Sequence, residues 1–298
     1  MLGPVLAVTV GVPELGGATR AYRHLLGLEV LSEGEVPPSL AVAWDAPMVV
    51  GARWALLGRT GARRGLVRVL EVGAVERPLP FRTLGWAALE VLVADADLAL
   101  DRCRTEPAFQ VVHAPTPVGA AGSLRALQVA GPGGEGVYLT EVREVPPGFS
   151  LPALTEGEGL VYAVVAATAD LHSTRSWFTD VFLLRPITDH ALPVRVLNVA
   201  FGLPMTTLHR LSSVQLEGDT LLEIDQYPAG TPVRRAPGGG MPGGLALVSF
   251  AGRRPPLPGA RPLPPLVVPP YCGHPGWAVR GPDGLGFEVI CSSLEERP

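Results

Sequence analysis

The sequence GDTLLEIDQY, at residues 218–227, is the stretch of the chain that indicates its fold most directly. Apolar residues flank Glu223, so the run is typical of a buried strand that carries one carboxylate. An unpaired buried charge costs on the order of several kcal/mol, so this carboxylate must be paired, protonated, bound to a metal or turned toward a polar cavity. A second run, GPDGLGFEVI at residues 281–290, places Glu288 in the same way. Two such strands predict a repeated architecture in which the two glutamates share a cavity.

The predicted elements recur along the chain in a fixed order. Residues 5–72 predict a strand, a helix and further strands, and the same order returns over residues 86–142 and 160–226. A last unit begins with the strand-like residues 244–250. The proline density of residues 253–270 (RRPPLPGARPLPPLVVPP) forbids a regular helix there. The sequence therefore predicts four units, the last with an extended connection in place of its helix.

A short motif supports this repeat. Residues 43–48 (AWDAPM) and 200–205 (AFGLPM) share an alanine, an aromatic residue, two variable residues, a proline and a methionine. Two interpretations of the large side chains stay open, because they either wall an apolar ligand pocket or pack in the core. These side chains are Trp44, Met48, Phe201 and Met205.

The amino-acid composition limits the classes of protein to which the chain can belong. Of 298 residues, 47% are hydrophobic and 17% are charged, which is typical of a globular protein. The net charge of -4, with scattered arginines, argues against nucleic acid as a partner. No apolar run approaches the ~18–20 residues of a membrane span. The 3 cysteines lack CxxC spacing, which indicates free thiols in a reducing compartment. We expect a cytoplasmic protein, monomer or homodimer, whose partner is a small molecule.

Several motifs resemble the vicinal oxygen chelate superfamily, which includes glyoxalase I, bleomycin-resistance proteins and extradiol dioxygenases. Residues 21–28 (AYRHLLGL) are similar to the family's helix end FYRDVLGL, and residues 177–184 (WFTDVFLL) are a looser copy. Residues 281–288 (GPDGLGFE) are similar to its final hairpin DPDGNLIE, and residues 220–225 to the same strand one module earlier. The resemblance covers essentially the whole chain.

This resemblance implies an α+β fold of the two-domain, four-module form. Four βαβββ modules are paired into two cup-shaped mixed-sheet domains, and a Pro-rich segment replaces the helix of the fourth module. A proline-containing break near the middle of the chain divides the modules two and two. We expect an N-terminal glyoxalase-like domain at residues 1–146 that is structural, and a C-terminal one at residues 155–295 that holds the functional cavity.

The resemblance also implies a divalent metal (Fe, Mn, Zn or Ni) held between the first and last strands of paired modules. Glu223 and Glu288 match the last-strand carboxylates of the C-terminal half, while Tyr138 stands at that position in the second module. His209, on a neighbouring strand, is the residue expected to complete a site with the two glutamates. The first-strand positions hold side chains that cannot bind a metal: Ala7, Ala88, Ala163 and residues 243–245.

Two hypotheses for function follow. The first is an enzyme in which Glu223 and Glu288 are catalytic, as metal ligands or as a metal-free acid–base pair. Such a lyase, isomerase or oxygenase acts on a small oxygenated or aromatic molecule in the C-terminal cup. The second is a non-catalytic binding protein of the bleomycin-resistance kind, for which small residues at the ligand positions leave room. The expected ligand-binding residues are His209, Phe201, Met205 and Tyr138.

Overall fold

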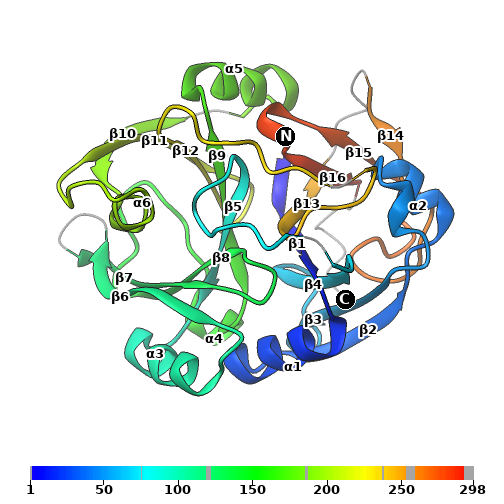
Figure 1. The fold of residues 1–298 in the computed structure, drawn as a ribbon, viewed down its shortest axis with the longest axis horizontal. Helices are drawn as coiled ribbons and strands as arrows, with labels where there is room; N and C mark the ends of the chain where they lie inside the picture. Colours follow the sequence, from blue (N-terminus) through cyan, green and yellow to red (C-terminus); the bar gives the residue numbers. More distant parts are fainter. Residues whose placement is uncertain are drawn as a thin grey trace.

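The computed structural model contains two eight-stranded sheets that lie side by side (Figure 1). Four successive units along the chain supply their strands, as the sequence predicted. The structure describes residues 2–74, 76–118, 122–184, 187–236, 238–252 and 259–291.

The elements follow the predicted order of a strand, a helix and further strands. The first unit contains β1 (Leu2–Val12), α1 (Leu15–Leu26), β2 (Glu29–Glu35), α2 (Pro38–Ala43), η1 (Pro47–Val49), β3 (Arg53–Gly58) and β4 (Leu66–Glu71). The second contains β5 (Gly85–Leu92), α3 (Ala96–Thr105), β6 (Gln110–Val118), β7 (Leu124–Ala130) and β8 (Gly136–Val142). After α4 (Leu154–Gly157), the third contains β9 (Val161–Thr168), α5 (Leu171–Phe182), β10 (Thr188–Pro193), α6 (Arg195–Phe201), β11 (Leu208–Gln215) and β12 (Leu221–Gln226). The fourth contains β13 (Gly244–Gly252), β14 (Arg261–Pro262), β15 (Gly276–Arg280), η3 (Pro282–Gly284) and β16 (Gly286–Ile290).

The fourth unit lacks the long helix of the other three over the part of the chain that the structure describes. Residues 259–275 hold only the short strand β14 and turns, which agrees with the predicted extended connection. Proline cannot donate a backbone hydrogen bond and clashes with the preceding turn, so a helix is excluded from this proline-rich run. Residues 253–258, which the sequence assigned to the same connection, lie outside the described residues.

The sheets pair the units differently from the prediction. One sheet has the order β14-β15-β16-β13-β1-β4-β3-β2 and joins the first unit to the fourth. The other has the order β10-β11-β12-β9-β5-β8-β7-β6 and joins the second unit to the third. The prediction that consecutive units share a cup was therefore wrong, and the ranges 1–146 and 155–295 do not coincide with the two sheets. Proline-rich connections show where a chain turns, but they do not determine which strands pair.

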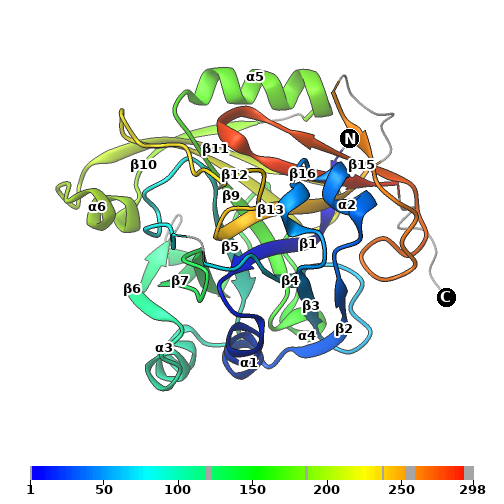
Figure 2. The ribbon, with the colours of Figure 1, turned by 45° about the vertical axis from the view of Figure 1, so that its right-hand side comes forward.

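A common core lies between the two sheets, which we call the first–fourth sheet and the second–third sheet. Figure 2 shows α5 at one end of this core and α1 and α3 at the other. Trp86 on β5 packs against Phe287 on β16 with ring centroids 5.1 Å apart. The indole Nε1 of Trp86 also donates a hydrogen bond to the Gly286 carbonyl at 2.7 Å, which joins the two sheets.

Helix α1 shows how the local sequence fixes these elements. Glu14 caps its N-terminus, because its carboxylate accepts hydrogen bonds from the Gly16 and Gly17 amides at 2.6 Å each. Gly27 ends the helix with a φ of 65°, a left-handed conformation that favours glycine. The helix predicted in the first unit is therefore confirmed.

One face of each sheet packs on the common core. The opposite face, turned away from this core, is the one that we call the inner face of that sheet. On the first–fourth sheet, a large apolar cluster that includes α2 and η1 fills this face. On the second–third sheet the apolar residues form two smaller clusters, one of which includes α6, and ionisable side chains interrupt the apolar surface. Among the described residues, no helix is long and apolar enough to cross a membrane.

Candidate functional site

Glu288 lies at the centre of the filled inner face of the first–fourth sheet. Its side chain is 0% exposed, and each carboxylate oxygen accepts hydrogen bonds. Oε1 accepts from Trp44 Nε1 and from the Tyr271 hydroxyl, both at 2.7 Å. Oε2 accepts from the Ser249 hydroxyl at 2.5 Å and from Arg68 Nη2 at 3.3 Å. The predicted burial of Glu288 is confirmed, and hydrogen bonds and an ion pair compensate for it.

Aromatic rings enclose the cation of this pair. The Arg68 guanidinium lies 5.3 Å from the Trp44 ring centroid and 5.2 Å from that of Tyr271, within the range of cation–π attraction. Arg68 is only 3% exposed. Its charge and that of Glu288 neutralise each other inside a closed apolar cluster, so this group is built to stabilise the fold.

Glu223 does not share a cavity with Glu288. It lies on β12 in the second–third sheet, whereas Glu288 lies on β16 in the first–fourth sheet. The hydrogen-bond partners of Glu288 all belong to the first and fourth units. The predicted carboxylate pair is therefore wrong, because the first strand of the third unit pairs with the second unit instead of the fourth.

Strand register brings other ionisable residues to the inner face of the second–third sheet. Glu90 on β5 pairs with Tyr138 on β8 and with Ala163 on β9. On the neighbouring rung, Val165 pairs with Glu223. Asp225 is two residues beyond Glu223 on the same strand, so it faces the same side. Three carboxyl groups, which we call the acidic group, therefore face one surface: Glu90, Glu223 and Asp225.

Burial and mutual repulsion raise the pKa values of the acidic group. Burial and the charge of Asp225 raise the pKa of Glu223 well above its usual range. Burial raises the pKa of Asp225 to about 7, against a hydrogen bond from Glu223 that lowers it. Burial and the charge of Glu223 raise the pKa of Glu90 to about 7. Near neutral pH, Glu223 therefore holds a proton beside a carboxyl group that is partly ionised.

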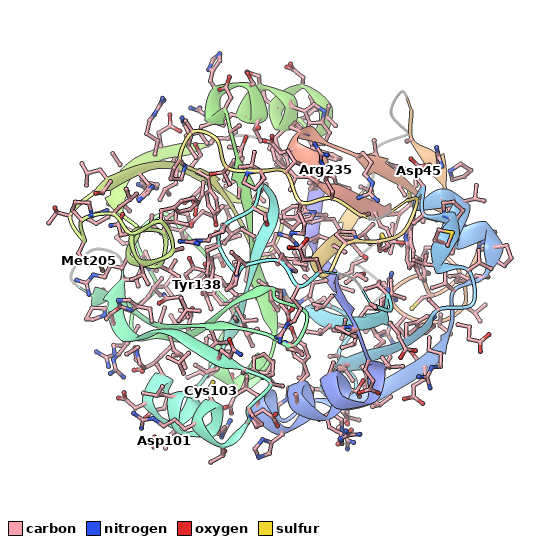
Figure 3. All side chains as sticks on the ribbon, viewed as in Figure 1. Asp45, Asp101, Cys103, Tyr138, Met205 and Arg235 are labelled. Atoms are coloured by element: carbon pink, nitrogen blue, oxygen red, sulfur yellow. The ribbon has the colours of Figure 1, made fainter. Side chains whose placement is uncertain are left out.

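Tyr138 lies among these groups, inside the curl of the second–third sheet (Figure 3). Burial raises the pKa of its phenol, and the charges of the surrounding Asp225, Tyr227, Glu223 and Glu90 raise it further. Glu90, Tyr138 and Glu223 are partly exposed, although their backbones belong to central strands of the sheet. Solvent therefore reaches this face, in contrast to the closed group around Glu288.

His209 lies on β11 and connects α6 to the second–third sheet. Its Nε2 lies 2.7 Å from Asn198 Oδ1, and the Asn198 amide donates to the carbonyls of Met205 and Thr207. Burial lowers the pKa of His209, which favours the neutral ring. The structure therefore gives His209 a hydrogen-bonding partner on α6, whereas the sequence predicted a metal role.

The two other predicted ligand-binding residues have different surroundings. Phe201, the last residue of α6, packs edge-on against Tyr227 with ring centroids 5.9 Å apart. It belongs to the apolar cluster of the inner face and is partly exposed. Met205 is 46% exposed and lies at the periphery of the molecule in Figure 3. Phe201 and Tyr138 therefore border the inner face, while Met205 does not line it.

The residues present do not fit the divalent metal that the resemblance implied. Within the described ranges, no group of three or more His, Cys, Asp or Glu side chains is placed to hold a metal ion. The first-strand positions Ala88 and Ala163 carry methyl groups on this face. His209 is held by Asn198, and Glu288 belongs to the other sheet. We therefore derive no step through a metal.

Sequence reasoning missed Glu90 and Asp225. Glu90 stands in the run WAALEVLV at residues 86–93, which has the same pattern of a carboxylate among apolar residues as Glu223. Asp225 follows Glu223 at a spacing of two, which places both side chains on one face of a strand. A carboxylate among apolar residues indicates Glu90, and a spacing of two from Glu223 indicates Asp225, so the sequence contains the pattern for both residues.

Comparison with known proteins identifies the fold. No protein-family model and no curated protein matches the sequence. Glyoxalase I from Zea mays superposes with a TM-score of 0.61 at 14% identity, covering 96% of this chain and 92% of that one. A mutant of glyoxalase I from Zea mays gives 0.62 at 14% identity, with 96% and 93% covered. A putative dioxygenase from Bacillus subtilis gives 0.61 at 12% identity, with 97% and 85% covered. The chain therefore has the fold of glyoxalase I and of this putative dioxygenase, as the resemblance of its motifs predicted.

Proposed function

We propose that the chain is an enzyme that moves protons on a small oxygenated or aromatic molecule at the inner face of the second–third sheet. One observation carries the proposal, namely that Glu90, Glu223 and Asp225 face the same surface with raised pKa values. Paired carboxyl groups whose pKa values differ supply an acid and a base at the same pH. This assigns function to the second and third units, which the sequence had placed in separate domains.

The reaction best suited to this group is an isomerisation or elimination next to a carbonyl. Ionised Asp225 accepts the proton from the carbon beside the carbonyl, and the bonding electron pair moves toward the carbonyl oxygen. Glu223 holds a proton beside it and donates that proton to the developing oxyanion. In an isomerisation of an α-hydroxy carbonyl compound, Asp225 returns its proton to the former carbonyl carbon, and the proton of the α-hydroxyl group passes to ionised Glu223 as the new carbonyl forms. In an elimination, the enol O–H returns its proton to Glu223, the carbonyl re-forms, and the leaving group departs from the β carbon.

The surroundings support such chemistry. Glu90 accepts a hydrogen bond from the Tyr162 hydroxyl at 2.8 Å, which fixes one member of the acidic group. Phe81 packs edge-on against Tyr138 with centroids 5.8 Å apart and adds an apolar border. An apolar surround keeps the carboxyl pKa values high enough for proton transfer near neutral pH.

Hydrogen–deuterium exchange tests the proposal. The protein is incubated in D₂O with hydroxyacetone and 2-hydroxyacetophenone, and loss of the C–H signal is followed by NMR. We expect exchange above the buffer rate, and a fall of about 100-fold or more in Asp225→Asn and Glu223→Gln. Glu33→Gln, on the exposed strand β2, is the control and should not change the rate. Wild-type exchange that survives both site substitutions refutes the proposal, and binding without exchange indicates sequestration instead.

A further inference from the structure

We infer that the ligand of this inner face is a hydrogen-bond donor, neutral or cationic, such as an aromatic molecule that carries an amine or a hydroxyl group. Anionic ligands are excluded by the same chemistry. The inference rests on the proposed function for the location of the site, but it concerns recognition and does not depend on proton transfer. It follows from the hydrogen-bond acceptors, the charges and the aromatic rings around the acidic group.

Two buried acceptor atoms on this face have no donor among the described residues. Asp225 is 1% exposed, and its Oδ1 has no hydrogen-bond partner in the described part of the chain. Gln128 is 5% exposed, and its Oε1 likewise has none. Gln128 pairs with Tyr138, which pairs with Glu90, so its side chain faces the acidic group's side of the sheet. A buried acceptor without a donor loses the hydrogen bond that water gives it in the unfolded chain, and a ligand that donates a hydrogen bond restores this interaction.

The charges favour the same class of ligand. The acidic group supplies only negative charge, and the pKa values near 7 mean that this charge grows as the pH rises. Arg234 lies close enough to influence the pKa of Tyr227. Its guanidinium donates to the carbonyls of Leu245 and Trp86, so backbone groups satisfy this cation. An anion bound here would meet like charges and no available counter-ion among these groups.

The rings on this face suit an aromatic or apolar body. Tyr138 and Phe201 are both partly exposed, and each packs edge-on against a second ring. Tyr138 is also central to the acidic group, since its pKa responds to all three carboxyl groups. An aromatic amine can therefore place its ring beside Tyr138 and its ammonium group among the carboxyl groups, where cation–π attraction adds to the ionic contact.

Three probes that share one ring test the inference. Benzylamine, benzyl alcohol and benzoate differ in the charge and hydrogen-bonding character of one substituent, and NMR titration at about pH 8 measures the dissociation constant of each. We expect benzylamine to bind roughly 10-fold or more tightly than benzoate, with benzyl alcohol between them. The affinity for benzylamine should rise with pH through about 7, because Glu90 and Asp225 ionise there.

Variants locate the binding. Asp225→Asn should reduce the preference for benzylamine over benzoate, and Gln128→Leu should weaken benzyl alcohol. Glu33→Gln removes a charge from the exposed strand β2 and should leave all three affinities unchanged. Equal affinities for benzylamine and benzoate, or no benzylamine binding up to its solubility, would overturn the inference. Selective amine binding without deuterium exchange would reject only the proposed chemistry, whereas exchange confined to anionic substrates would reject only this inference.

Discussion

Replacing Glu288 by glutamine should lower the free energy of unfolding by about 3–5 kcal/mol, because the change leaves a buried cation without its counter-ion. Arg68 is 3% exposed and lies between two aromatic rings, so water cannot replace the lost charge. The glutamine oxygen can still accept from Trp44 and Tyr271. Its amide group then faces Arg68 and Ser249, which are the donors to the other carboxylate oxygen. The Ser249 hydroxyl can rotate to accept from this amide, but the Arg68 guanidinium can only donate, so a buried cation would face an N–H donor.

A surface ion pair supplies the matched control. Glu71 accepts from Arg53 at 2.9 Å, but the Arg53 side chain is 60% exposed and remains solvated when the pair is broken. Glu71→Gln is therefore expected to cost less than about 1 kcal/mol. The difference between the two Glu→Gln variants isolates the effect of burying the pair.

A double variant separates the charge effect from packing. Arg68→Leu combined with Glu288→Leu removes both charges, so it should cost less than the sum of the two single variants. Urea unfolding followed by tryptophan fluorescence measures each free energy, and equal m-values make the comparison valid. If Glu288→Gln costs no more than Glu71→Gln, or if the two leucine substitutions are additive, the argument from a buried ion pair is refuted.

The remaining predictions concern the acidic group and the backbone. Glu90 and Asp225 hold their protons more tightly in the folded than in the unfolded chain, so the stability that they contribute is fully present at low pH and is lost as the pH rises through about 7. Asp225→Asn should therefore flatten the pH dependence of unfolding between about pH 4 and 7, and an unchanged profile would contradict these shifts. Gly65 has a φ of 64°, and an added Cβ would lie 2.7 Å from Leu160 Cγ and 2.8 Å from the Val161 carbonyl oxygen, whereas Gly61, at 82°, has open space. Gly65→Ala should thus lower the thermal midpoint well beyond Gly61→Ala, which costs only about 1 kcal/mol of backbone strain, and equal midpoints would refute the steric argument.

The sequence predicted the local elements of the fold because local chemistry determines them. The cap of α1 and the turn before β16 depend on a few adjacent residues, such as Gly27 at φ 65° and Gly284 at φ 79°. The partner of each first strand was not predictable in this way. β1 and β9 are both buried along their whole length and mostly apolar, so each can pair with any similar strand. Long-range packing in the common core selects the partner.

The sequence predicted the buried acids of the candidate site, but it did not predict which residues surround them. An isolated carboxylate in an apolar strand indicates a buried acid, and both Glu223 and Glu288 are such acids. Whether an acid is neutralised depends on residues far away in the sequence. Glu288 meets Arg68, which is 220 residues away, and Glu223 meets Glu90 and Asp225.

Strand register explains why the two inner faces differ. Ala7 on β1 pairs with Ser249, and Ala163 on β9 pairs with Glu90. Ser249 and Glu90 therefore occupy corresponding places on the first strands of the fourth and second units. A small hydroxyl stands at this place in one sheet, and a carboxyl group stands there in the other.

On the last strands of the units, the positions of the glutamate and the hydroxyl-bearing residue are reversed between the two sheets. Ser249 pairs with Glu288 on β16, and Glu90 pairs with Tyr138 on β8. Each sheet thus has one glutamate on this rung, on the last strand in the first–fourth sheet and on the first strand in the second–third sheet. In both sheets, a hydroxyl-bearing residue takes the other position.

The difference in charge between the two inner faces follows from one further position. Two residues beyond the alanine of each first strand, β1 pairs with Arg68 and β9 pairs with Glu223. In the first–fourth sheet, the arginine neutralises the glutamate and the face closes around an ion pair. In the second–third sheet, a second acid stands at the same place, so the charges repel and one proton is retained. Repulsion between like charges cannot be relieved within this face, and the face therefore remains available to a proton or a cationic ligand.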